Sequence, residues 1–182
     1  MFRVLCPGLL VVCACAQAGR ATADAAPPLD SAPPIDSPSG GTCLTGATCQ
    51  SAMSLGSVSG DTGAMMQMAS AYQSAWFAVR VTEDDHGIAG AKLELTVRLT
   101  SPASAHYDVF AYVNTGSDIL ECATPSGTTT TTGTTDQVKL RWGEGSIPNG
   151  SDDSRTVSIE VRPSSSTCSA SEPWQLVVVG DT

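Results

Sequence analysis

The sequence predicts an all-β fold, a two-sheet antiparallel β-sandwich of about eight or nine strands. Three observations lead to this prediction. Apolar residues alternate with polar ones in short runs from Leu55 onward, which is the period of half-buried strands. Clusters of turn-forming residues separate these runs. Ser, Thr and Gly are abundant and charged residues make up only 15% of the chain, a composition that disfavours helix.

The clearest strand is AKLELTVRLT, residues 91–100, in which every second residue is Leu or Val and the intervening ones are polar. RTVSIEVR, residues 155–162, repeats the pattern. The other predicted strands are, in chain order, SLGSVSG (54–60), MMQMAS (65–70), SAWFAVRVT (74–82), HYDVFAYV (106–113), DILEC (118–122), DQVKLRW (136–142) and PWQLVVVG (173–180). The polar run GTTTTTGTT, residues 127–135, is predicted to be a loop between strands.

Strands that are apolar on one face need a second sheet to cover that face, so a sandwich is favoured over an open sheet. Trp76, Trp142 and Trp174 lie in or at the end of such strands, and we expect them in the core. An exposed aromatic platform for sugar is the alternative, drawing on the same tryptophans with Tyr72, Tyr107 and Tyr112.

The first residues have the layout of a bacterial export signal, with Arg3 followed by an apolar stretch and then small residues. Val12-Cys13-Ala14-Cys15 resembles the lipobox of bacterial lipoproteins, so residues 1–14 are predicted to be a signal peptide and Cys15 the lipidated residue. In the alternative, cleavage after Ala18 releases a secreted protein. Residues 15–41, rich in Pro, Ala, Ser and Asp, are predicted to be a tether, and residues 42–182 the folded domain.

Four cysteines fall within the predicted domain, and an even number in an exported chain predicts disulfides. Three pairings are possible. Spacing along the chain favours Cys43 with Cys49 and Cys122 with Cys168. A cysteine-based metal site is disfavoured, since neither a CxxC pair nor a nearby histidine accompanies them.

The charge of the chain limits its partners. Nine basic and 18 acidic residues give a formal net charge of −9 and a pI of about 4.4, and no cluster of Lys or Arg appears in the sequence. A nucleic-acid partner is therefore not expected.

Several segments together resemble the bacterial pre-peptidase C-terminal domain: LGSVSGDTG, SAWFAVRV, HYDVFAYVNTGSDIL, TVSIEVRPSSS and PWQLVVVG. The resemblance spans Leu55–Gly180 and implies a jelly-roll-like sandwich that acts as a non-catalytic accessory module in an exported lipoprotein. Some members of that family bind calcium. Ala75 stands where the family has an acidic residue, and Asp108 is the single carboxylate of its segment, so this chain departs from the family pattern at both places.

Catalytic motifs are absent from the sequence. His86 and His106 are the two histidines, and neither G-x-S-x-G nor H-E-x-x-H occurs, so we expect no enzyme. Ca²⁺ is the one cofactor that the acidic loops suggest, since it takes carboxylate and carbonyl oxygens. The candidate ligands are Asp84, Asp85, Asp108, Asp152 and Asp153, which would have to be assembled by the fold.

The sequence thus predicts a non-catalytic binding or structural module, anchored by lipid at the outer membrane or cell surface. Its partners would be the membrane and an envelope protein or carbohydrate. The alternative is a soluble extracellular accessory domain that binds carbohydrate or calcium, and a hydrolase is the weakest prediction.

Overall fold

The structure is a computed structural model that describes residues 43–85, 92–143 and 150–181. Within these ranges the single helical element is a 3-10 turn, η1 (Cys49–Ser51), and no helix there is long and apolar enough to cross a membrane. The predicted signal peptide, Cys15, the tether and His86 lie outside the described residues.

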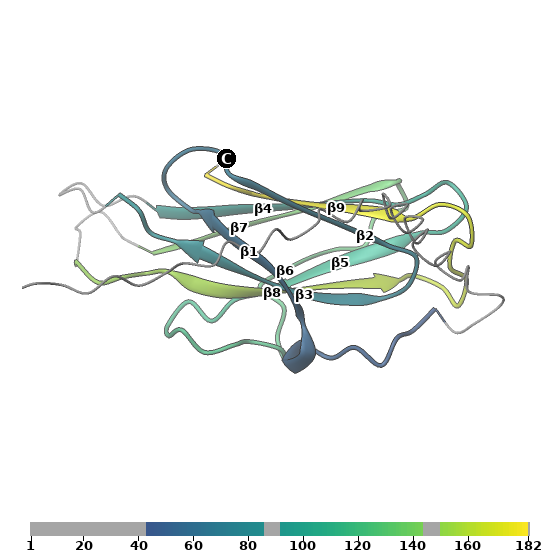
Figure 1. Cartoon of the computed structure of the whole chain (residues 1–182), viewed down its shortest axis with the longest axis horizontal. Helices are drawn as coiled ribbons and strands as arrows, with labels where there is room; N and C mark the ends of the chain where they lie inside the picture. Colours follow the sequence, from purple (N-terminus) through teal and green to yellow (C-terminus); the bar gives the residue numbers. More distant parts are fainter. Residues whose placement is uncertain (1–42, 86–91, 144–149, 182) are drawn as a thin grey trace, which may run out of the picture. The chain divides into compact units, whose positions relative to one another are not determined.

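Nine strands form two sheets that lie one above the other in Figure 1. Sheet A has the order β1 (Met53–Ser59), β3 (Ala75–Thr82), β8 (Arg155–Pro163), β5 (Tyr107–Tyr112) and β6 (Gly127–Thr129). Sheet B has the order β2 (Met66–Ala71), β9 (Trp174–Gly180), β4 (Lys92–Thr100) and β7 (Thr135–Gly143). All paired strands are antiparallel except β1 and β3, which are parallel. The predicted β-sandwich is confirmed.

The core lies between the sheets and follows the predicted alternation. In β4 the inward side chains Leu93, Leu95, Val97 and Leu99 are fully buried. Trp174 is also fully buried, and its indole N–H donates a hydrogen bond of 2.9 Å to the carbonyl oxygen of Gln73, which satisfies its one polar atom. The inward strand faces thus form one apolar cluster.

Two predicted elements differ from the structure. DILEC is not a strand: Ile119 and Leu120 are exposed, and the Glu121 carboxylate accepts hydrogen bonds from the backbone N–H groups of residues 122–124. Those three bonds fold the chain into a turn. Instead β6, three residues of the polar GTTTTTGTT run, pairs with β5. β6 is a strand because it pairs with β5, and its sequence has no alternation of apolar and polar residues.

The predicted disulfide pairing is wrong. The bonds join Cys43 to Cys168 and Cys49 to Cys122, with Cα–Cα distances of 5.4 and 5.9 Å. The prediction gave weight to short spacing along the chain, whereas antiparallel folding brings distant residues together. The Cys49–Cys122 bond attaches the segment after β5 to η1, next to Ser158 on the outer side of sheet A.

Candidate functional site

The structure places the five predicted calcium ligands at two different ends of β8. Asp108 pairs in register with Arg162 near the end of β8, whereas Asp152 and Asp153 precede Arg155 at its start. Seven residues separate Arg155 from Arg162, roughly 23 Å of extended chain. The fold therefore does not bring Asp108 beside Asp152 and Asp153, whereas Glu83, which precedes Asp84 and Asp85, accepts a hydrogen bond from the backbone N–H of Asp153.

The aspartates at the start of β8 serve the local structure. Asp152 accepts a 2.8 Å hydrogen bond from the backbone N–H of Ser154, and its hydrogen bonds with Ser154 lower the pKa of its carboxyl. Asp153 forms an ion pair with Arg155 at 3.2 Å. In the segment that follows β3, the backbone N–H groups of Asp84 and Asp85 donate hydrogen bonds to the Asp61 carboxylate.

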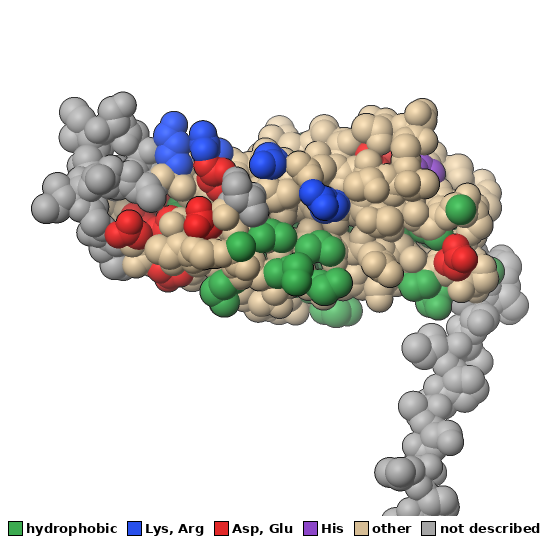
Figure 2. Space-filling view, turned by 90° about the horizontal axis from the view of Figure 1, so that it is seen from above, with side chains coloured by type: hydrophobic (Ala, Val, Ile, Leu, Met, Phe, Trp, Pro, Cys, Tyr) green, Lys and Arg blue, Asp and Glu red, His purple; other side chains and the backbone are tan. Residues whose placement is uncertain are grey.

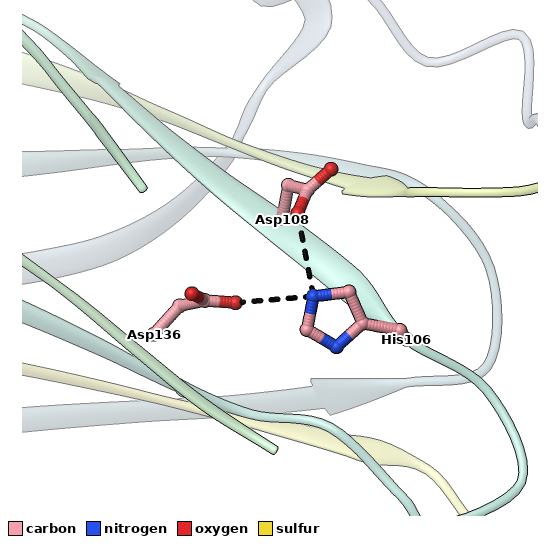
Figure 3. Close-up of side chains that lie close together, drawn as sticks. All are labelled: His106, Asp108 and Asp136. Carbon is pink, nitrogen blue, oxygen red and sulfur yellow. Dashed lines mark ion pairs between the residues drawn. The ribbon is translucent and has the colours of Figure 1, made fainter. Parts of the chain in front are cut away.

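Among the described residues, a single group of three side chains has the geometry of a metal site: His106, Asp108 and Asp136 (Figure 3). His106 immediately precedes β5 and Asp108 is its second residue, while Asp136 is the second residue of β7 in the facing sheet. β6 ends at Thr129, opposite Val109, so Asp108 has no β6 neighbour at this end of β5. Asp136 reaches His106 and Asp108 at this edge of the sandwich.

The three ligand atoms lie within 4.8 Å of one another. His106 Nε2 is 3.5 Å from Asp108 Oδ1 and 3.7 Å from Asp136 Oδ2, drawn as dashed lines in Figure 3. Both contacts lie beyond the 2.7–3.2 Å range that is usual for N–H···O hydrogen bonds. Accordingly, His106 Nε2 and Asp136 Oδ2 are buried without any hydrogen-bond partner.

The other oxygen of Asp136 is fully engaged. Oδ1 accepts hydrogen bonds from the Thr129 hydroxyl at 2.9 Å, the Thr131 hydroxyl at 2.7 Å and the Thr131 N–H at 3.2 Å. These bonds fix the orientation of a carboxylate that has no exposed surface, and they direct Oδ2 toward His106.

Burial raises the pKa of Asp108, and the nearby Asp136 carboxylate raises it further. The charges of His106 and Arg162 act in the opposite direction. The Asp108 carboxyl is therefore harder to ionise than a carboxyl in water.

A shallow depression of about 390 Å³ borders the cluster. His106 lines it, together with the β6–β7 loop residues Thr132 and Thr134 and the later residues Ser165 and Thr167. This opening gives small solutes access to the imidazole from outside the sandwich.

Among the described residues, no hydroxyl group donates a hydrogen bond to His106 Nε2. A catalytic serine or threonine would donate its hydroxyl proton to an imidazole nitrogen, and His106 Nε2 has no hydrogen-bond partner. The nearest hydroxyl groups that contact the cluster, those of Thr129 and Thr131, donate to Asp136.

The sequence prediction included Asp108 but missed Asp136 as a ligand, although the strand pattern contained a signal. In DQVKLRW the buried residues Val138, Leu140 and Trp142 alternate with exposed ones, and Asp136 belongs to the same buried, inward-facing series. A carboxylate in the inward series of a strand needs a partner, because a buried charge without one is costly.

Most of the aromatic side chains proposed for a sugar platform are buried. Tyr107, Tyr112, Trp142 and Trp174 are buried, and Tyr72 and Trp76 are only partly accessible. Trp76 packs against Tyr112 with 5.2 Å between ring centroids, and the Tyr112 hydroxyl donates to Glu160 at 2.8 Å. The expectation that Trp142 and Trp174 lie in the core is confirmed, and four of the six aromatic side chains of the alternative platform are not available to a sugar.

A second feature is the outer face of sheet B, seen in Figure 2 as a group of hydrophobic side chains beside a row of basic ones. Cross-strand register gives two rows of neighbours across the four strands. One row is Met66, Val179, Thr96 and Lys139, and the next is Met68, Val177, Arg98 and Gln137. The β2–β9 half of the face is thus apolar, and the β4–β7 half carries cations.

This outer face gathers basic residues that the sequence shows as scattered. Lys92, Arg98, Lys139 and Arg141 are all exposed on it, because they alternate with the core residues of β4 and β7. The one acidic side chain within this group of strand residues, Glu94, forms an ion pair with Arg141. The linear sequence shows no basic cluster, so it did not predict this basic surface, which forms only when β4 and β7 pair.

Comparison with known proteins identifies a solved structure that is similar to this one. No protein-family model matches the chain, and no curated protein matches it. The structure is similar to the crystal structure of the pre-peptidase C-terminal domain of collagenase from Bacillus anthracis, with a TM-score of 0.38 and 5% sequence identity, over 71% of this chain and 94% of that chain. That domain is of the family that the sequence motifs resemble.

Proposed function

We propose that the chain is an exported, non-catalytic module that is held at the cell envelope by lipid on Cys15 and docks on an anionic lipid surface through the outer face of sheet B. The observation that carries the docking proposal is the division of that face into an apolar half and a basic half. Met66 and Met68 are 56% and 60% exposed although they are apolar.

Charge complementarity favours an anionic lipid surface as the occupant of the face. Two of the nine Lys and Arg residues, Arg3 and Arg20, precede the domain, and four of the remainder lie on this face of a chain whose net charge is −9. An anionic bilayer attracts such a patch and repels the acidic remainder, which orients the molecule. The thioether and valine side chains then enter the interfacial region, where apolar area adds to binding.

Export is supported by the cysteines. All four cysteines of the described residues are paired in disulfides, and such bonds persist in oxidising compartments. Mass spectrometry of the mature N-terminus tests the anchor. An acylated Cys15 is expected. A free N-terminus at Gly19 would reject the lipid anchor and show that the chain is cleaved after Ala18 and secreted.

Sedimentation with vesicles tests the docking face. The exported chain is mixed with vesicles of phosphatidylcholine alone or with added phosphatidylglycerol. Tighter binding to the anionic vesicles is expected, and a lipid on Cys15 contributes equally to both, so the difference reports the protein surface. Lys139→Ala is expected to lower the preference for anionic vesicles about fivefold, since one basic residue near the surface contributes about 1 kcal/mol.

Arg80→Ala is the control for loss of a positive charge elsewhere, because Arg80 lies on sheet A, where it is half-buried and paired with Asp118, and not on the docking face. It should leave the preference unchanged. Equal binding to the two kinds of vesicle, or an equal effect of the two variants, would reject the docking proposal. Equally tight binding to a DNA oligonucleotide would show that the face recognises any polyanion and would also reject a lipid-specific role.

A further inference from the structure

We propose that His106, Asp108 and Asp136 bind a divalent transition-metal ion, for which Zn²⁺ is the best match. This site is separate from the docking face and does not depend on it. The first argument is that two buried atoms, His106 Nε2 and Asp136 Oδ2, have no hydrogen-bond partner and contact each other only at the 3.7 Å distance of an ion pair. Buried polar groups in folded proteins almost always have a partner, and two that face each other indicate a missing one between them.

The second argument is the spacing of the ligand atoms. With metal–ligand bonds of about 2.0–2.1 Å, two ligands of a tetrahedral zinc ion are about 3.3 Å apart. The observed separations of His106 Nε2 from the two carboxylate oxygens are 3.5 and 3.7 Å. They are too long for good hydrogen bonds and would shorten by a few tenths of an ångström around an ion. The two carboxylate oxygens, which lie within 4.8 Å of each other, would also approach one another.

The third argument is the support of the ligands. Oδ1 of Asp136 is held by Thr129 and Thr131, which leaves Oδ2 as the free donor atom of a fully buried side chain. Hydrogen bonds of this kind orient ligating carboxylates in metal sites. Three protein ligands leave the fourth position of a tetrahedral ion for water.

The donor set selects the type of metal. Imidazole nitrogen suits Zn²⁺ and its first-row neighbours, whereas Ca²⁺ takes six to eight oxygen ligands. Three side-chain ligands that include one nitrogen do not provide that number of oxygens. The bound ion would join β5 of sheet A to β7 of sheet B at the edge where β6 ends, and it would act as a cross-link between the sheets.

Thermal unfolding of the exported, disulfide-bonded chain tests the site. After treatment with a chelator, the chain is measured with and without ZnCl₂. At a concentration about 100-fold above the dissociation constant, zinc is expected to raise the midpoint by roughly 5–10 °C, and CaCl₂ at the same concentration should not. An unchanged midpoint with zinc would reject the site.

Variants assign any effect to the three residues. His106→Gln and Asp108→Asn should abolish the zinc-induced shift, and Asp136→Asn should do the same if it folds. Asp84→Asn, an exposed aspartate in a different loop, is the control and should retain the full shift. A shift that persists in both His106→Gln and Asp108→Asn would reject the assignment even if zinc stabilises the chain.

Co²⁺ gives a second measurement that does not depend on stability. The visible absorption of bound Co²⁺ reports its coordination, so wild type is expected to show the intense bands of a tetrahedral site and His106→Gln to lose them. Weak bands like those of the hydrated ion in the wild type would contradict the proposed geometry.

Discussion

Trp174 is the largest side chain that the sandwich buries completely. Its ring meets Phe77 edge-on at 5.9 Å between centroids and lies 6.3 Å from the ring of Tyr107. The tyrosine hydroxyl donates to the carbonyl oxygen of Tyr72, next to Gln73, which accepts from the indole. These residues connect β9 of one sheet to β3 and β5 of the other.

Trp174→Ala should therefore lower the free energy of unfolding by about 3–5 kcal/mol, through lost burial, a cavity and an unpaired carbonyl group. Urea unfolding measures the effect. The neighbouring Gln175→Ala, whose side chain is exposed, should change the stability by less than about 0.5 kcal/mol. Similar losses for the two variants would contradict this account of the core.

Asp118 shows how an exposed loop residue depends on pH. A hydrogen bond from Arg80 lowers the pKa of its carboxyl below the ordinary value of 3.8, and the backbone N–H of Thr156 also donates to it. Since the pKa is lower in the folded state than in the unfolded one, the ionised carboxylate stabilises the fold above the unfolded-state pKa. That contribution is lost as the pH falls through the folded-state pKa.

Asp118→Asn should thus cost a few tenths of a kcal/mol at pH 7, because the pair is partly exposed to solvent, and nothing at a pH below the folded-state pKa, where the wild-type carboxyl is protonated. Unfolding curves of both proteins at the two pH values check this. A cost that is equal at both would mean that the ion pair is not its source.

At the scale of elements, the sequence predicted strands well wherever one face is apolar. β4 and β8 were found by their alternation. β6 was missed because a short edge strand of Gly and Thr has no apolar period, and its pairing with β5 is a tertiary contact. DILEC failed for the converse reason: it has apolar residues, but Glu121 and the Cys49–Cys122 bond hold it outside both sheets. No local pattern contains that information.

The disulfides give a prediction at this scale. Mass spectrometry of unreduced peptides should find Cys43 linked to Cys168 and Cys49 linked to Cys122, and a Cys43–Cys49 peptide would contradict the fold. Removing the second bond by Cys49→Ala with Cys122→Ala should cost about 4 kcal/mol by loop-closure entropy, for a sequence separation of 73 residues. Urea unfolding of the double variant measures it.

At the scale of the whole molecule, one core cluster contains inward residues of both sheets. The sheets are also joined at their ends, where Gly60 donates to Thr82 of sheet A and accepts from Glu94 of sheet B. A domain with a single shared core is expected to unfold as one unit. The candidate site depends on the same arrangement, since its three ligands come from two sheets, and this is why the sequence prediction had Asp108 but not its partners.

Cooperative unfolding is tested by comparing near-ultraviolet and far-ultraviolet circular dichroism during a urea titration. The near-ultraviolet signal reports aromatic packing on both sheets and the far-ultraviolet signal reports strand content. The two curves should coincide at a fixed metal concentration. Separate midpoints would show that one sheet loses its packing before the other.

The Cys43–Cys168 bond determines how the domain bears tension applied along the chain from the residues before it. Without the bond, a pull on Cys43 would reach β1, an edge strand of sheet A, and strip it from β3. With the bond, the load passes at Cys43 into Cys168 and from there to β9, an internal strand of sheet B that pairs with neighbours on both sides. The disulfide thus directs mechanical load past the edge strand β1 and into β9, which is hydrogen-bonded to a strand on each side.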